Sequence, residues 1–336
     1  MNPSIHQSIT QAPSSPPATV AAASPAYIYS TAEKARLAFT CVRQRWFPRR
    51  NLFVGPYAGE FGPELMQFQG YVRARRRYYK EVHVLTYPGR EYLYEGCHVH
   101  AHDINLKNAG YWYGRLSPAE AAAMANAKAA ELGLDNYDIF NTSLLCTQYH
   151  KRLFWRQEFR LLEEPPLVER PYDIVFHFRA VRKAGPDPLK NYPPALADEL
   201  AQRCIDRRLS VACVGHPDYS YCAAGCDDHR YADLRKTVAA ISSARAGVGE
   251  ASGGMHLVNA CGRPSIIWGD GQWRIDPALR WNPFRVPIYV VTNEAWQPAP
   301  ERVCGSVENA LEDLRSRTAG FTRPAYRLPA CQIGYF

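Results

Sequence analysis

The chain has 336 residues, of which 46% are hydrophobic, and it carries a formal net charge of +8. This length allows two domains of ordinary size, and no apolar run reaches the ~18 residues that suggest a membrane-spanning helix. The positive charge favours phosphate-bearing ligands or an anionic membrane surface. No recognisable nucleic-acid-binding motif accompanies it, so we expect no nucleic-acid partner.

The first 30 residues are rich in Ser, Pro and Ala, and we expect them to form a disordered tail. Their apolar stretch is short and has no basic region before it, which argues against a signal peptide. We therefore expect the 10 cysteines to be free thiols of a cytoplasmic protein. Residues 32–47 predict a basic amphipathic helix, which either packs on its own domain or lies on the inner face of a membrane as a peripheral contact.

Residues 52–85 predict the opening of a doubly wound α/β domain: a short strand, a glycine-containing loop, a helix and a second strand. Pro63 suits the first turn of that helix. The loop would lie at the carboxyl end of the first strand, where such domains bind ligands. Glu64 and Glu60 belong to this stretch, and we expect Glu64, with Glu60 as the alternative, to act as a catalytic base.

Histidines alternate in the stretch from Cys97 to Asp103, so that His98, His100 and His102 would share one face of a strand. Such spacing can bind a metal ion, whereas a polar strand face or a loop needs none. Because nothing else in the chain supplies an obvious further ligand, we expect no metal here.

A proline-rich stretch at residues 163–171 is typical of a linker between two domains. The predicted parts are a tail at 1–30, an amino-terminal acceptor domain at 31–165, a carboxy-terminal nucleotide-sugar-binding domain at 170–320 and a tail at 321–336. The predicted helices cover 63–79, 118–132, 148–162, 194–207, 228–244 and 306–318. The predicted strands cover 52–54, 82–85, 137–140, 172–179, 209–214, 246–248, 266–268 and 287–291.

Basic residues follow the first strand of the second domain. The strand ends at His177 and Arg179, and the loop after it carries Lys183 and Lys190. Positive side chains on such a loop can neutralise a diphosphate leaving group. A solvated loop charge is the alternative interpretation of Lys190.

A glycine-containing turn joins a later strand to a helix. Ser252 can cap this helix, while Gly253 and Gly254 let a ligand approach its first backbone N–H groups, which carry the positive end of the helix dipole. His256 lies near the helix start, where it can reach a phosphate or a ribose, or it is a core histidine. An ordinary crossover without a ligand would also explain the turn.

These motifs resemble those of the heptosyltransferase-like family of GT-B glycosyltransferases, glycosyltransferase family 9. The matching residues are Gly59, Gly62, Lys190-Asn191-Tyr192-Pro193, Ser252, Gly253, Met255, His256, Leu257, Gly262 and Pro264. The family usually has Asp at the position of Pro63, and Glu64 or Glu60 is the nearest substitute. It also usually has Asp at the position of Ala251, and Glu250 stands one place earlier.

A shorter resemblance links His177-Phe178-Arg179 to the His-x-Arg strand end of GT-B fucosyltransferases. The two resemblances imply a GT-B fold: two Rossmann-like domains with parallel sheets that face each other across a cleft. They imply that the donor contacts His177, Arg179, Lys183, Lys190, Glu250, Ser252, Gly253, Gly254 and His256.

The implied activity is a glycosyltransferase that moves a sugar, with inversion, from a nucleotide diphosphate sugar to a glycan, a lipid or another hydroxyl acceptor. The chain has no Asp-x-Asp sequence for a divalent ion, so we expect metal-independent transfer and no cofactor besides the nucleotide sugar. The alternatives are a non-catalytic nucleotide- or glycan-binding protein of the same fold and a nucleotide-sugar epimerase.

Overall fold

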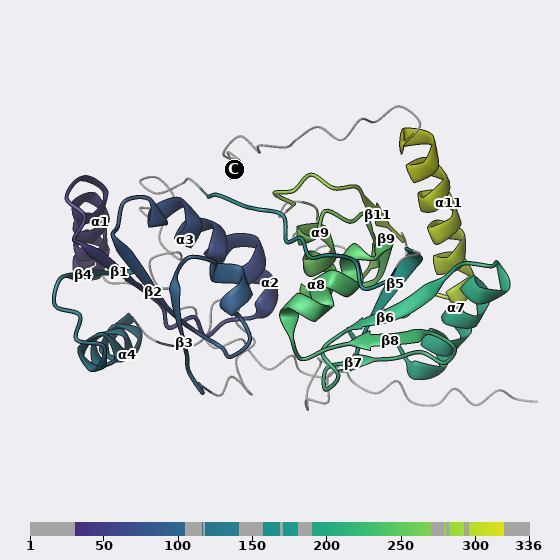
Figure 1. The fold of residues 1–336 in the computed structure, drawn as a ribbon, viewed down its shortest axis with the longest axis horizontal. Helices are drawn as coiled ribbons and strands as arrows, with labels where there is room; N and C mark the ends of the chain where they lie inside the picture. Colours follow the sequence, from purple (N-terminus) through teal and green to yellow (C-terminus); the bar gives the residue numbers. More distant parts are fainter. Residues whose placement is uncertain are drawn as a thin grey trace, which may run out of the picture.

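Two parallel β-sheets organise the chain in the computed structural model (Figure 1). The structure describes residues 31–104, 116, 118–140, 157–168, 171–180, 190–269, 279, 282–291 and 296–318. The predicted tails at 1–30 and 321–336 therefore lie outside the described residues.

The two halves of the chain each supply one sheet with its helices. The amino-terminal half contains α1 (Thr31–Trp46), β1 (Asn51–Val54), α2 (Phe61–Pro63), the π-helical η1 (Glu64–Phe68), α3 (Gln69–Arg76), β2 (Glu81–Thr86), the short η2 (Glu91–Tyr94), β3 (His98–Ala101), α4 (Pro118–Glu131) and β4 (Tyr137–Phe140). The carboxy-terminal half contains β5 (Tyr172–Arg179), α7 (Pro194–Asp206), β6 (Val211–Gly215), β7 (Ser220–Tyr221), β8 (Asp227–Arg230), α8 (Leu234–Ser242), β9 (Ala244–Glu250), α9 (Gly253–Ala260), β10 (Ser265–Trp268), β11 (Ile288–Val290) and α11 (Pro300–Thr318).

The strand orders confirm the predicted fold class of two Rossmann-like α/β units. The first sheet has the order β3-β2-β1-β4, and the second has the order β11-β10-β9-β5-β6-β8, with every pair along both paths parallel. Within the second unit, β5, β6, β8, β9, β10 and β11 are strands one to six, so the order is the doubly wound 3-2-1-4-5-6. The first sheet has the 3-2-1-4 part of the same order.

Helices cover both faces of each sheet, which explains why the strands are so apolar. In the first unit, Leu52 packs toward the η1–α3 side, whereas its neighbour Phe53 packs against α4. In the second unit, Val175 packs with α8 and α9, whereas Phe176 packs with α7 and α11. Successive strand residues thus fill opposite cores.

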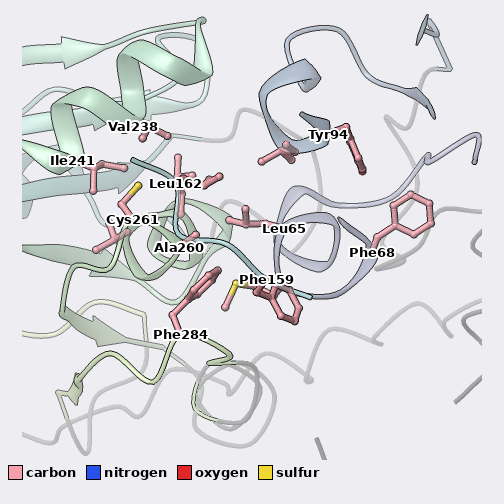
Figure 2. Packing of buried hydrophobic residues seen from close by; sticks show 14 of the residues in the cluster. Leu65, Phe68, Tyr94, Phe159, Leu162, Val238, Ile241, Ala260, Cys261 and Phe284 are labelled. Atoms are coloured by element: carbon pink, nitrogen blue, oxygen red, sulfur yellow. The ribbon is translucent and has the colours of Figure 1, made fainter. Parts of the chain in front are cut away.

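The two units share one continuous hydrophobic cluster (Figure 2). Leu65 of η1 and Ala260 of α9 belong to it, and the extended segment 157–162 runs between them. The backbone N–H of Leu162 donates to Ala260 O at 2.9 Å, and Gln157 Nε2 donates to Gln67 O at 3.1 Å. The segment that connects the units is therefore packed along their contact.

Four predicted helices differ from the observed elements, and one of them, predicted at 306–318, begins earlier, at Pro300. Residues 157–162 are extended, and the rest of the predicted helix 148–162 lies outside the described residues. Within the predicted helix 228–244, Asp227–Arg230 forms β8 beside β6, and α8 starts only after Asp233, whose side chain caps it. The predicted helix 63–79 is the continuous run from α2 through η1 to α3.

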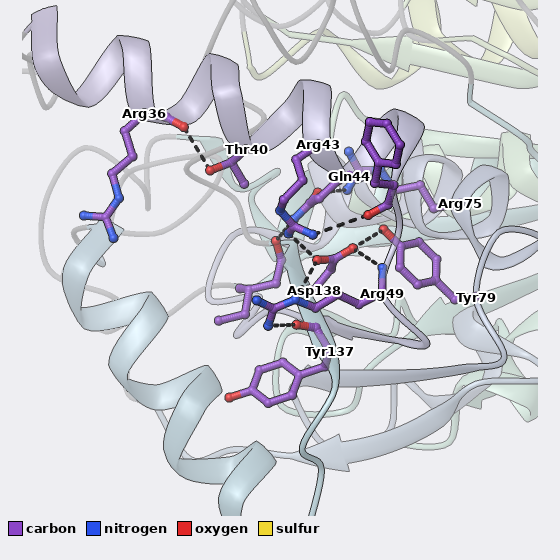
Figure 3. Close-up of polar contacts among 11 residues, drawn as sticks. Arg36, Thr40, Arg43, Gln44, Arg49, Arg75, Tyr79, Tyr137 and Asp138 are labelled. Atoms are coloured by element: carbon purple, nitrogen blue, oxygen red, sulfur yellow. Dashed lines mark hydrogen bonds and ion pairs between the residues drawn. The ribbon is translucent and has the colours of Figure 1, made fainter.

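Helix α1 packs on its own unit (Figure 3). This is the first of the two alternatives that the sequence left open for this segment. Arg43 pairs with the buried Asp138 of β4, and Gln44 Nε2 donates to Ile139 O at 2.8 Å. The backbone N–H of Arg49 and the hydroxyl of Tyr79 also donate to Asp138, at 3.0 and 3.1 Å. These contacts fix one face of α1 against β4.

The opposite face of α1 is apolar and exposed. Phe39, Trp46 and Phe47 are 71%, 67% and 75% exposed, and the Arg45 guanidinium lies 5.6 Å from the Trp46 ring centroid. Among the described residues, none of the helices has the length and apolar character required to cross a membrane.

Candidate active site

The second sheet has a topological switch point between β5 and β9. The two strands are parallel neighbours in register at His177 and Gly249, and the chain leaves them toward opposite sides of the sheet. In doubly wound sheets, ligands bind outside the carboxyl ends of the strands at this point. The loop after β5 and the turn after β9 are therefore the first place to look for a site.

Glu250, the last residue of β9, ties these two segments together. Its fully buried carboxylate accepts the backbone N–H of Tyr192 at 2.7 Å and that of Arg179 at 3.2 Å. Burial raises the pKa of Glu250 to about 7, although the backbone donors and the Arg179 charge act in the opposite direction. Glu250 thus holds the start and the end of the basic loop rather than facing solvent.

His177 packs against the start of α9. Its Nδ1 lies 3.4 Å from Ser252 Oγ, and its ring occupies the space where a side chain at Gly254 would begin. Burial lowers the pKa of His177 to about 4, and repulsion from Arg179 adds to this effect, while a backbone hydrogen bond opposes it. The imidazole is therefore neutral at pH 7, so one of its nitrogens donates a hydrogen bond and the other accepts one.

Ser252 stands at the N-cap of α9, as predicted, but its side chain makes no capping hydrogen bond. The absence of a side chain at Gly254 leaves room for the His177 ring, and the predicted approach of a ligand to this residue stays a prediction. The first N–H groups of a helix have no intrahelical partner. The positive end of the α9 dipole thus lies at Ser252 and the first helical turn.

The first unit meets α9 through the loop that contains Gly59 and Gly62. A Cβ atom on Gly253 would lie 3.3 Å from the backbone nitrogen of Gly62 and 3.3 Å from Phe61 Cδ1. A Cβ atom on Gly62 would lie 3.1 Å from His256 Cδ2. The two motifs that the sequence singled out, about 190 residues apart, therefore face each other directly.

Glu60 lies at this contact. It is the N-cap residue of α2, it is half-buried, and its carbonyl oxygen accepts the Tyr57 hydroxyl at 2.6 Å. Tyr57 is itself fully buried, so this bond fixes the backbone of Glu60 at the edge of the loop. Glu60 thus directly precedes Phe61, which lies against Gly253 of α9, and its side chain is partly exposed.

Glu64 has a different environment, one helical turn further on. Its side chain is fully buried, and its carboxylate accepts the Thr86 hydroxyl at 2.6 Å, the Tyr94 hydroxyl at 2.8 Å and Arg90 Nη1 at 3.1 Å. Burial and the neighbouring Glu64 charge together hold the pKa of Tyr94 well above its usual range. This carboxylate is enclosed by the protein.

Arg90 was not identified from the sequence. Its guanidinium lies 4.1 Å from the centroid of the Phe61 ring while it pairs with Glu64, so it stands behind the loop that meets α9. In the sequence, Arg90 is a single arginine after Pro88-Gly89, and this pattern is too common to identify a site residue. Its position makes it a further basic group near the contact.

The remaining basic candidates lie on or near the loop after β5. Arg179 and Lys190 are half-buried at its two ends, and Lys183 lies outside the described residues. Tyr192 is buried, its ring lies 5.0 Å from that of Trp268, and its hydroxyl donates to Pro298 O at 2.7 Å. The Lys190–Pro193 motif is thus anchored through Tyr192, which leaves Lys190 at the end of the basic loop.

No family model matches the chain, and no curated protein matches its sequence. Several solved structures are similar to it. An ADP-heptose LPS heptosyltransferase II from E. coli is 15% identical, with a TM-score of 0.48 over 79% of this chain and 99% of that one. A family 9 glycosyltransferase from Veillonella parvula is 10% identical, with a TM-score of 0.45 over 79% and 97%.

A third similar structure is an iron-containing dodecameric glycosyltransferase from enterotoxigenic E. coli. It is 13% identical, with a TM-score of 0.46 over 82% of this chain and 81% of that one. These structures thus include members of the family that the sequence motifs resemble. The expectation that this chain needs no cofactor besides the nucleotide sugar stays a prediction.

Proposed function

We propose that the chain is a glycosyltransferase that uses a nucleotide diphosphate sugar as its donor. The observation that carries the proposal is the direct apposition of the Gly59–Gly62 loop and the start of α9 at the switch point of the second sheet. A helix start at a switch point suits a phosphate group, and a carboxylate on the facing loop suits the activation of a hydroxyl.

In the proposed reaction, an acceptor hydroxyl attacks the anomeric carbon of the donor sugar in a single displacement. The bond from that carbon to the diphosphate oxygen breaks, and the nucleoside diphosphate leaves with the bonding electrons. The hydroxyl proton passes to the base. The anomeric configuration is inverted, because one displacement occurs at that carbon.

Glu60 is the base in this proposal, and Glu64 is a positioning residue. Glu60 is partly exposed and directly precedes Phe61 at the contact with α9. Glu64, in contrast, is fully buried, and three side chains donate hydrogen bonds to it. A base must be within hydrogen-bond reach of the proton that it takes, which full burial prevents. Glu64 instead orients Arg90 toward the loop.

The donor diphosphate would be neutralised without a metal. The first N–H groups of α9 supply the helix dipole, and Arg179 and Lys190 supply full charges at the ends of the loop after β5. Ser252, Gly253 and His256 lie at the same helix start, and Lys183 remains a candidate from the sequence. Glu250 and His177 would shape this region, since one holds the basic loop and the other packs on Gly254.

A peripheral membrane contact is part of the proposal for the acceptor. The exposed side of α1, together with Phe47 directly after it, combines Phe39, Trp46 and Phe47 with Arg45. Aromatic side chains with adjacent arginines suit the interface of an anionic membrane. A lipid-linked acceptor at the inner face of a membrane would then be held near the enzyme.

Ligand binding tests the donor assignment before any acceptor is known. We expect nucleoside diphosphates to raise the Tm of the purified chain, because a ligand at 100 times its Kd adds about 2.7 kcal/mol to the free energy of unfolding. Arg179→Ala should weaken diphosphate binding by one or two orders of magnitude, since charged hydrogen bonds contribute about 1.5–3 kcal/mol. It should leave nucleoside binding nearly unchanged.

The matched control is Arg208→Ala, which removes an exposed arginine between α7 and β6. No response to any nucleoside diphosphate would contradict the proposal. Binding without sugar transfer would favour a non-catalytic binding protein, and conversion of the donor sugar without an acceptor would favour an epimerase.

A further inference from the structure

Four side chains with metal-binding chemistry gather at the amino-terminal ends of β2 and β3. The parallel register pairs His83 with His98, and it places Glu81 and His100, each two residues away along its strand, on the same face. The His83 ring stacks on the His98 ring at 4.8 Å and on the His100 ring at 5.5 Å. His102, which the sequence grouped with these histidines, lies beyond the end of β3, where its Nε2 donates to Tyr57 O at 2.7 Å.

Three of these residues present one ligand atom each to a common point. The ligand atoms of Glu81, His83 and His98 all lie within 4.8 Å of one another, and Glu81 Oε2 lies 3.7 Å from His83 Nε2. Ligand atoms around a tetrahedral zinc ion are roughly 3.4 Å apart, given bonds of about 2.1 Å. Small side-chain rotations therefore bring the three atoms into range.

His83 carries an unsatisfied nitrogen that points to this place. The side chain is more than nine-tenths buried, and its Nε2 makes no hydrogen bond to any residue that the structure describes, although Glu81 Oε2 lies 3.7 Å away. Its other nitrogen, Nδ1, lies 3.2 Å from His100 Nε2. If Nδ1–H donates to His100, the lone pair of His83 Nε2 is left in the protein interior with nothing to accept, which is costly unless something binds it.

Other charged side chains lie near these histidines. Two lysines are nearby: Lys80 Nζ lies 3.8 Å from Glu81 Oε1, and Lys128, whose charge reaches His100, pairs with Glu131 at 2.5 Å.

We propose that Glu81, His83 and His98 bind a zinc ion and that His100 is a positioning residue for His83. Two imidazoles and one carboxylate are a ligand set that zinc accepts in tetrahedral geometry, with water as the fourth ligand. The exposed side of His98 leaves room for that water. A hydrogen bond from the second imidazole nitrogen, as from His83 to His100, is the usual means of orienting a zinc-bound histidine.

The proposed ion would stabilise the edge of the first sheet. It would join β2 to the edge strand β3 at their amino-terminal ends, whereas Thr86, at the carboxyl end of β2, bonds to Glu64 near the candidate active site. The zinc site is therefore separate from the proposed transfer chemistry and does not rest on it.

Zinc titration of the chelator-treated full-length chain tests this site. We expect one tight Zn²⁺ per chain by calorimetry, a higher Tm with Zn²⁺ and no change with Mg²⁺. His83→Gln and His98→Gln should each abolish the tight binding. His100→Gln should weaken it by about 10- to 100-fold while the stoichiometry stays at one, as for other residues that orient a ligand.

Two control variants separate this site from other zinc ligands. His229→Gln removes a half-buried histidine that bonds to Tyr172 at 2.9 Å, and Cys222→Ser removes a partly exposed thiol. Both should bind zinc as the wild type does. Substitution with Co²⁺ should give a spectrum without a thiolate charge-transfer band.

The proposal is wrong if the wild-type chain binds no zinc tightly. It is equally wrong if His98→Gln binds zinc as tightly as the wild type, or if tight binding disappears in Cys222→Ser. Because His98 is exposed, we expect His98→Gln to fold. This variant therefore tests the site even if His83→Gln fails to fold.

Discussion

Glu60 and Glu64 are four residues apart, yet their surroundings differ in burial and in hydrogen bonding. Glu64 is enclosed by Thr86, Tyr94 and Arg90, whereas Glu60 lies at the contact between the two units with part of its side chain in solvent. A base must reach the proton that it removes, and a buried carboxylate with filled acceptor sites does not. In our proposal, Glu64 is therefore a positioning residue.

We expect Glu60→Gln to lower the rate of sugar transfer by 10²–10⁴-fold with little change in Tm or donor affinity. Glu64→Gln should instead lower the free energy of unfolding by about 1–3 kcal/mol, because three donors lose a charged acceptor. Transfer rates and denaturation midpoints of both variants check this. Full activity of Glu60→Gln together with an inactive, stable Glu64→Gln would reverse the assignment.

His177 and Glu250 should give the stability opposite dependences on pH. The pKa of Glu250 is about 7 instead of 4.5, so folding binds a proton there, and this contribution is lost as pH rises from 4.5 to 7. The pKa of His177 is about 4 instead of 6.5, so its neutral form favours folding, and stability is gained as pH rises from 4 to 6.5.

Single substitutions should reveal how each group changes the free energy of unfolding between pH 4.5 and 6.5. Relative to the wild type, Glu250→Gln should gain stability as pH rises, and His177→Gln should lose it, each by up to about 1.4 kcal/mol per pH unit. Urea denaturation at three pH values measures both differences. If the free energy of unfolding of both variants changes with pH as that of the wild type does, these groups titrate normally.

Residue types and spacings alone located the two loops of the candidate site, because glycines and charged residues next to strand ends are local signals. They did not distinguish Glu60 from Glu64, because the partners of Glu64 come from β2 and η2, 22 and 30 residues away. They also did not identify Arg90, whose role depends on Phe61 and Glu64 together. Such long-range hydrogen bonds have no sequence pattern.

At the scale of elements, strands and helices with clear periodicity were predicted within a few residues. The errors fall where tertiary contacts override local preference. The polar segment Asp227–Arg230 becomes an edge strand because β6 offers it a partner, and residues 157–162 stay extended because they pack between the two units. A single-sequence pattern contains neither the partner nor the packing.

Helix α1 combines a fixed face and an exposed face, which leads to a prediction on membranes. We expect the wild-type chain to sediment with anionic vesicles, less so as salt rises, because the exposed aromatics insert and the arginines meet lipid charge. The double variant Phe39→Ser/Trp46→Ser should lose most of this binding. Its Tm should hardly change, since both side chains are exposed.

The control is Tyr219→Ser, which removes an exposed aromatic side chain from the second unit. It should bind vesicles like the wild type. Equal binding by the double variant and the wild type would show that α1 is not the contact, and the helix would then serve only to cover β4.

At the scale of the whole molecule, the two units are coupled through apolar contacts and through the segment between them. Leu65, Leu162, Ile241 and Ala260 belong to one buried cluster, and a side chain from either unit completes the core of the other. Arg235 of α8 also lies 5.0 Å from the Tyr92 ring centroid and 3.5 Å from Glu164. The sequence predicted a linker here but could not show that it is packed.

This shared core should make the described units unfold together. Leu162 is 3% exposed in the cluster, so Leu162→Ala should cost about 2–5 kcal/mol and move a single cooperative transition to lower denaturant concentration. Leu167→Ala, five residues on in the same segment, removes a side chain that is 43% exposed and should change stability by less than about 0.5 kcal/mol. Tryptophan fluorescence and far-UV circular dichroism should report coincident transitions in all three proteins. If the two probes separate in the wild type, or if Leu162→Ala shifts only one of two transitions, the units fold independently and the contact between Gly62 and α9 is a transient one.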